Sequence, residues 1–117
     1  MTRFVTKLLC LLVVVTSALS AADMTGKWTF HVKFFLGSGD PWFEFKQDGE
    51  KLTGMYHGRF GEKQLTGTVK GNQVDFSFAD NRGTASYSGT VTGDQISGKA
   101  KYPAPAGTGH FEGKRTK

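Results

Sequence analysis

The sequence predicts an all-β protein, an eight-stranded antiparallel up-and-down meander β-barrel. Three observations lead to this prediction. From residue 26 onward, apolar and polar residues alternate with a period of two, as in strands that bury one face. Glycine-containing turn sequences interrupt the alternation at short intervals. No window shows the i, i+3, i+4, i+7 spacing of an amphipathic helix.

Residues 1–22 are predicted to be a signal peptide that is removed. Arg3 and Lys7 form a positively charged start, an apolar run follows, and residues 20–22 fit a small-x-small cleavage site. The apolar run is well short of the roughly 20 residues that a membrane-spanning helix needs. We therefore expect residues 23–117 to form a single β-barrel domain in a secreted or periplasmic protein, with no membrane span in the mature chain.

Cysteine usage and charge exclude several classes of site. The single cysteine, Cys10, lies in the predicted leader, so the mature chain can carry no disulfide, thiolate metal site or cysteine nucleophile. The formal net charge of the full chain is +5, and two of its basic residues belong to the leader. The lysines are spread along the chain and form no dense basic patch, so no nucleic-acid partner is predicted.

The first predicted strand, residues 26–34, is the strongest pattern in the chain. Its alternate apolar residues face one side, with lysine, threonine and histidine on the other. Residues 35–41 contain the run Gly-Ser-Gly-Asp-Pro and break the alternation, so a loop is expected there. The apolar face of the strand consists of Trp28, Phe30, Val32 and Phe34.

The next three strands follow in hairpins. Residues 42–47 alternate phenylalanine with charged residues, and Asp48-Gly49 is a signal for a tight hairpin turn. Residues 51–60 alternate again, with Leu, Tyr and Phe on one face. The turn at Gly61-Glu62 leads into residues 63–70, which have Leu and Val on the same face as a central glycine.

Four more strands complete the chain, each preceded by a turn or loop that contains glycine. Short connections force neighbouring strands to be antiparallel, which gives a meander. A sheet with one apolar face can bury that face by closing on itself, which also removes both edges. A two-sheet sandwich is the alternative, but its crossovers need longer connections. The last four strands are residues 73–79, 84–92, 95–102 and 108–117.

A short motif, an apolar residue followed by Thr or Ser and then Gly, recurs along the strands. In each copy the glycine takes an inward-facing position, where glycine weakens a strand unless the position requires it. We interpret these glycines as allowing sharp coiling or making room for a ring from across the barrel. The clearest copies begin at Leu52, Leu65, Tyr87 and Ile96.

Gly26-x-Trp28 on the first strand and Arg115 on the last resemble the signature of the calycin superfamily, which includes lipocalins, fatty-acid-binding proteins and avidins. In that superfamily the tryptophan closes the bottom of the barrel and the arginine packs across its ring. The resemblance implies the same closure here by Gly26, Trp28 and Arg115. A guanidinium over an indole face is a favourable cation–π pair, and its donors can reach backbone carbonyls.

No catalytic or metal-binding set emerges from the sequence. His31, His57 and His110 fall on outward faces of three different strands, whereas a zinc site needs converging ligands. The carboxylates fall in turns or on outward faces, with no pair forced into the interior. We therefore predict a protein that is not an enzyme and uses no metal and no cofactor.

The leading hypothesis is a lipocalin-like barrel that binds a small apolar ligand at its open end. The alternatives are a secreted protein-binding module, such as a hydrolase inhibitor, and a ligand-free structural barrel. A cavity of about 300 Å³ or more would favour a ligand. The candidate ligand-binding residues are the inward aromatics Phe34, Tyr56, Phe60, Phe78, Tyr87 and Tyr102. The candidate partner contacts are the apolar residues at or near the first long loop, namely Phe35, Leu36 and Trp42.

Overall fold

The structure, a computed structural model, describes residues 22–116. The predicted leader and Cys10 lie outside the described residues, except for Ala22 at the end of the leader. Within the described residues every regular element is a strand. The strands are β1 (Gly26–Phe34), β2 (Gly37–Gly39), β3 (Trp42–Asp48), β4 (Lys51–Gly58), β5 (Gly61–Lys70), β6 (Gln73–Asp80), β7 (Gly83–Thr92), β8 (Gln95–Tyr102) and β9 (Gly107–Arg115).

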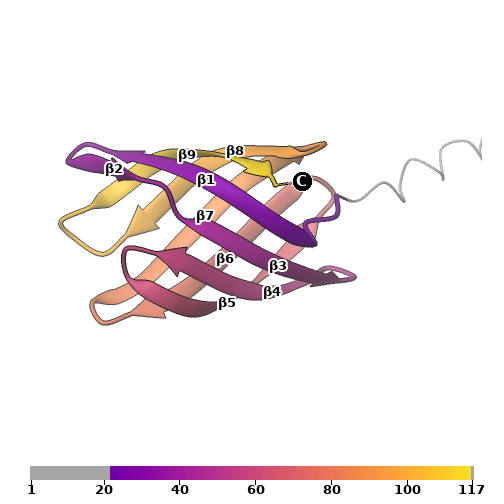
Figure 1. The fold of residues 1–117 in the computed structure, drawn as a ribbon, viewed down its shortest axis with the longest axis horizontal. Helices are drawn as coiled ribbons and strands as arrows, with labels where there is room; N and C mark the ends of the chain where they lie inside the picture. Colours follow the sequence, from indigo (N-terminus) through magenta and orange to yellow (C-terminus); the bar gives the residue numbers. More distant parts are fainter. Residues whose placement is uncertain (1–21, 117) are drawn as a thin grey trace, which may run out of the picture.

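The strands form one closed antiparallel sheet, in which consecutive strands from β3 to β9 are neighbours (Figure 1). β1 closes the barrel by pairing with β9, from Trp28 opposite Arg115 to Lys33 opposite His110. β2 and β3 both pair with β1, along its second and first halves respectively. They therefore act as one strand that is interrupted before β3, and the predicted eight-stranded up-and-down barrel is confirmed.

The loop predicted over residues 35–41 is wrong for its middle part. Residues 35–36 form a turn, and β2 then runs back along β1, with Phe34 opposite Gly37 and Val32 opposite Gly39. A Gly-Ser-Gly strand has no apolar alternation, so the sequence pattern could not reveal it. It forms because the turn returns the chain beside β1, where backbone groups alone can pair.

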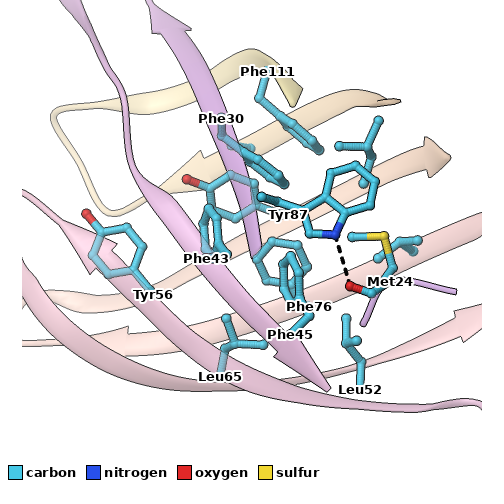
Figure 2. Close-up of a cluster of buried hydrophobic side chains, with 14 of the residues drawn as sticks. Met24, Phe30, Phe43, Phe45, Leu52, Tyr56, Leu65, Phe76, Tyr87 and Phe111 are labelled. Atoms are coloured by element: carbon cyan, nitrogen blue, oxygen red, sulfur yellow. Dashed lines mark hydrogen bonds between the residues drawn. The ribbon is translucent and has the colours of Figure 1, made fainter. Parts of the chain in front are cut away.

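The inward faces of the strands meet in an aromatic core (Figure 2). Phe30 stacks on Phe111 with ring centroids 5.0 Å apart, and Phe76 stacks on Tyr87 at 4.9 Å. Phe43 packs between Phe30, at 4.6 Å, and Phe76, at 5.2 Å. These rings fill the barrel between its two ends, so the interior is a packed core and not a continuous channel.

Two inward glycines show why the recurring motif needs glycine. A Cβ atom on Gly98 would overlap the carbonyl oxygen of Ser88 and the Cα atom of Gly89 on the neighbouring strand. A Cβ atom on Gly89, in the copy that begins at Tyr87, would overlap the ring of Phe111. Both expected roles therefore occur, since one glycine allows close approach of two backbones and the other makes room for a ring.

Replacing Gly98 with alanine should lower the free energy of unfolding by about 1–3 kcal/mol, because the added methyl group meets rigid backbone. Urea unfolding followed by circular dichroism measures the change. The matched control is Gly39→Ala, because a Cβ there has no atom within 4 Å and the variant should not be destabilised. Equal stability of the two variants would contradict the role assigned to the glycine.

Candidate functional site

One end of the barrel is closed by the segment that precedes β1. The Trp28 side chain is fully buried there, and its Nε1 donates a hydrogen bond of 2.9 Å to the carbonyl of Met24 (Figure 2). The guanidinium carbon of Arg115 lies 4.7 Å from the centre of the Trp28 ring. Arg115 comes from the last strand, opposite Trp28 in the β1–β9 pairing. The two residues therefore join the ends of the barrel sheet.

Arg115 also holds the segment before β1 by its hydrogen bonds. Its Nη1 and Nη2 each donate at 2.7 Å, to the carbonyls of Thr25 and Asp23, and its Nε donates at 2.7 Å to Asp94. Gly26 stands where this segment enters β1, with a φ of 124° that only glycine adopts readily. These contacts use every nitrogen of the guanidinium, so Arg115 has a structural role at this end.

Two residues at the closed end were not singled out in the sequence. Met24 is fully buried, and its amide donates to Oε1 of Gln47 at 2.8 Å. Nε2 of Gln47 donates to the carbonyls of Ala22 and Gly49, both at 3.0 Å. Met24 precedes the first strand and Gln47 is one polar residue among many in β3, so neither stands out in the alternation. Only the tertiary contacts reveal that they plug the barrel.

The opposite end is open and contains a cavity of about 350 Å³. The β1–β2, β4–β5, β6–β7 and β8–β9 turns gather around it, at the left of Figure 1. The lining is mainly apolar and includes four aromatic rings, with polar groups near the mouth. The apolar and aromatic lining residues are Val32, Phe34, Leu36, Pro41, Tyr56, Phe60, Tyr102, Pro105 and Ala106.

Four of the six predicted ligand-binding residues line this cavity, and two lie beneath it. The four are Phe34, Tyr56, Phe60 and Tyr102. Phe78 is buried and stacks on Tyr56 at 4.3 Å. Tyr87 is buried among the core rings. These two residues therefore support the floor of the cavity and do not contact its space.

The three tyrosines cluster at the inner end of the cavity. The hydroxyl groups of Tyr87 and Tyr102 are 2.5 Å apart, and the Tyr102 hydroxyl also interacts with that of Tyr56. Burial raises the pKa of all three phenols, because an apolar surrounding disfavours the charged phenolate. The cluster thus gives the apolar cavity a floor with a few neutral hydrogen-bonding groups.

Two arginines stand at the mouth of the cavity. Nη2 of Arg59 donates to the carbonyl of Ser38 at 3.4 Å, which links the β4–β5 turn to β2. The guanidinium carbon of Arg82 lies 5.0 Å from the centre of the Phe60 ring. The alternation over the predicted strand 51–60 put Arg59 on the outer face, but β4 ends at Gly58 and Arg59 lies in the turn that follows. Arg82 comes from a turn, where alternation indicates no direction, so neither arginine was a candidate site residue.

Asp80 is a further group at this end that the sequence placed in a turn. The structure places it at the end of β6, in line with the inward residues Phe76 and Phe78. Its Oδ1 accepts a hydrogen bond of 2.7 Å from the amide of Arg82, while its buried Oδ2 has no hydrogen-bond partner among the described residues. Its charge adds to the raised pKa of Tyr102, after the larger effect of burial.

The three candidate partner contacts do not lie together. Phe35 and Leu36 form the tip of the β1–β2 hairpin, where their exposed fractions are 98% and 66%. Trp42 lies on the outer face of β3, stacked on His57 with 3.7 Å between ring centroids, and the Lys27 ammonium is 4.3 Å from its centre. The sequence grouped the three because they are close in the chain. The structure leaves only Phe35 and Leu36 as a projecting apolar pair.

The outer face carries the histidines. His57 has Nε2 3.2 Å from Glu44 and Nδ1 3.2 Å from Glu62, while Nδ1 of His31 is 2.6 Å from Asp40. Within residues 22–116, no three His, Cys, Asp or Glu side chains come together in a way that could hold a metal ion. The same part of the chain contains no helix that is long and apolar enough to cross a membrane.

Comparison with known proteins identifies no relative, so a function has to be inferred from the architecture and the cavity. A scan against protein-family models found no family that matches the chain, and a search of curated proteins found no match either. The closed eight-stranded barrel is consistent with a calycin-like architecture.

Proposed function

We propose that the protein is a non-catalytic binding barrel that takes a small, largely apolar molecule into the cavity at its open end. The observation that carries this proposal is a cavity of about 350 Å³, lined mainly by apolar side chains, in a barrel that is otherwise filled. Binding pockets for small molecules are of this kind, with apolar walls and a few polar groups that orient the ligand. A purely structural barrel gives no reason for such a cavity.

The dimensions and polarity of the cavity define the ligand class. Its volume is near the lower end of the roughly 300–1,000 Å³ found for such sites, so the ligand should be small. Aromatic rings such as Phe34 and Phe60 would contact its apolar body. The hydroxyl groups of Tyr56 and Tyr102 would offer neutral hydrogen bonds at the inner end.

Blocking the cavity should abolish binding without unfolding the protein. Ala106 lines the cavity and is partly exposed, so Ala106→Trp should fill the space. We expect the affinity for the neutral apolar dye N-phenyl-1-naphthylamine, measured by fluorescence titration, to fall at least about tenfold. The matched control is Ala79→Trp on the outer face of β6, which should bind the dye like the wild type. Equal binding by both variants would refute this site.

Native mass spectrometry of the protein purified from its own host is the direct search for the natural ligand. A retained small molecule that the wild type carries and Ala106→Trp lacks would identify the ligand class. The same molecule on both variants would show that it binds elsewhere.

We further propose that the protein is exported and loses residues 1–22, on the leader features of the sequence. Ala22, the last of them, contacts the barrel end, because its amide donates to Gly71 and its carbonyl accepts from Gln47. Cleavage after Ala22 would remove these contacts and keep those of Asp23 and Met24. The intact mass of the protein from the host envelope or medium checks this, and a full-length cytoplasmic product would contradict it.

A further inference from the structure

The tip of the β1–β2 hairpin is unlike the rest of the surface. Among the described residues, the exposed large hydrophobic side chains are Phe35 and Leu36, which follow each other in the turn. The β1–β2 turn that carries them lies at the open end of the barrel (Figure 1). Exposing two adjacent large apolar groups costs free energy in water, so the tip is suited to an apolar surrounding.

Basic groups lie close to this tip. The exposed Lys33 is two residues before Phe35, and Arg59 is hydrogen-bonded to Ser38 on the other strand of the hairpin. Arg82 stands across the cavity mouth, and within the described residues no ion pair joins Arg59 or Arg82 to a carboxylate. Their charge is therefore available to an anionic surface.

The acidic groups at the same end form no ion pair with these arginines. Asp40 is paired with His31, and Glu62 contacts His57 on the outer face. Asp80 accepts a hydrogen bond from the backbone of Arg82. The open end thus combines a projecting apolar pair with cationic groups that have no anionic partner, which is the composition of an interfacial membrane anchor.

We propose that the hairpin tip docks on an anionic lipid bilayer, with Phe35 and Leu36 inserted among the acyl chains. Lys33, Arg59 and Arg82 then meet the lipid headgroups. A stable protein interface buries about 800 Å² on each partner, far more than two side chains on a narrow turn can supply. A bilayer needs only a few apolar side chains with basic neighbours. The charge and the small apolar area therefore favour a membrane over a protein partner.

Docking in this orientation has a consequence for the cavity. Leu36 belongs both to the tip and to the cavity lining, so the mouth would open toward the bilayer. An apolar molecule could then pass between membrane and cavity with little exposure to water. The docking itself does not depend on the cavity being occupied, because it rests on the tip and its basic neighbours.

Vesicle co-sedimentation tests the proposal without any cavity ligand. We expect binding of the wild type to phosphatidylcholine vesicles that contain about one quarter phosphatidylglycerol, and at least tenfold weaker binding to pure phosphatidylcholine. Phe35→Ser combined with Leu36→Ser should lower the partition coefficient at least about tenfold. Both residues are exposed, so the double variant should keep the melting temperature of the wild type.

A second variant reports insertion directly. With Phe35→Trp, the added tryptophan should show a blue shift in emission on anionic vesicles, relative to the wild type with Trp28 and Trp42 alone. The intact mass of each sample excludes a retained leader as the cause of binding.

Three results would overturn the proposal: equal vesicle binding by the wild type and the double variant, equal binding to neutral and anionic vesicles, or no vesicle binding by the wild type. If the wild type binds no vesicles but retains a protein from the host that the double variant does not retain, the tip belongs to a protein-binding module instead.

Discussion

Replacing Trp28 with alanine should lower the free energy of unfolding by about 3–5 kcal/mol, the range for loss of a fully buried large aromatic side chain. Trp28 is 0% exposed and is covered by Met24 on one side and Arg115 on another. Its removal leaves a void at the closed end and takes away the ring on which the guanidinium packs. The N-terminal segment loses its anchor to β1 at the same time.

Urea unfolding of Trp28→Ala, followed by circular dichroism, measures this loss. The second tryptophan supplies a matched control, because Trp42→Ala removes the same side chain from the outer face. We expect that control to lose no more than about 1.5 kcal/mol, since Trp42 contributes mainly its stacking on His57. A loss within about 0.5 kcal/mol for Trp28→Ala, typical of a surface site, would show that the ring does not close the barrel.

Above about pH 10 the protein should lose stability steeply, because the folded state holds three phenol protons that the unfolded state releases. Burial raises the pKa of Tyr56, Tyr87 and Tyr102 in the folded barrel, whereas unfolded tyrosines ionise near pH 10. The stabilisation is fully present below the unfolded pKa. As the pH rises beyond it, the free energy of unfolding should fall by up to about 4 kcal/mol per pH unit for three protons.

The near-ultraviolet absorbance of phenolate and circular dichroism together check the alkaline prediction. The chain has three tyrosines and all of them belong to this cluster, so every phenolate signal reports on it. Phenolate should appear in one step together with loss of structure. In Tyr87→Phe the slope should be shallower by about 1.4 kcal/mol per pH unit, because one proton fewer is released. Phenolate that forms near pH 10 in an intact barrel would refute the buried cluster.

Strand positions and strand direction were predictable because they depend on local patterns. Alternation shows directly which residues of β1 or β7 face inward, since side chains on a strand point to opposite sides. Glycine turns of a few residues leave antiparallel pairing as the available arrangement. β2 escaped this reasoning because its Gly-Ser-Gly sequence carries no apolar side chain.

The candidate site was predictable only in part. Alternation places Tyr56, Phe78 and Tyr87 on the inner face, but it does not say how high along the barrel axis each ring lies. That height depends on the tilt of the strands and the stagger between them. Phe78 and Tyr87 therefore belong to the packed layer beneath the cavity, while Tyr56 reaches the cavity itself.

The all-β class, the meander and the inward face of each strand follow from the sequence, because a period of two and short turns are local properties. Where the barrel is filled and where it is empty depends on the tertiary structure. Met24 plugs one end, and Arg59 and Arg82 gather at the other, because turns far apart in the chain meet when the sheet closes. A cavity is the space that side chains from several strands leave between them, so no single segment of the sequence encodes it.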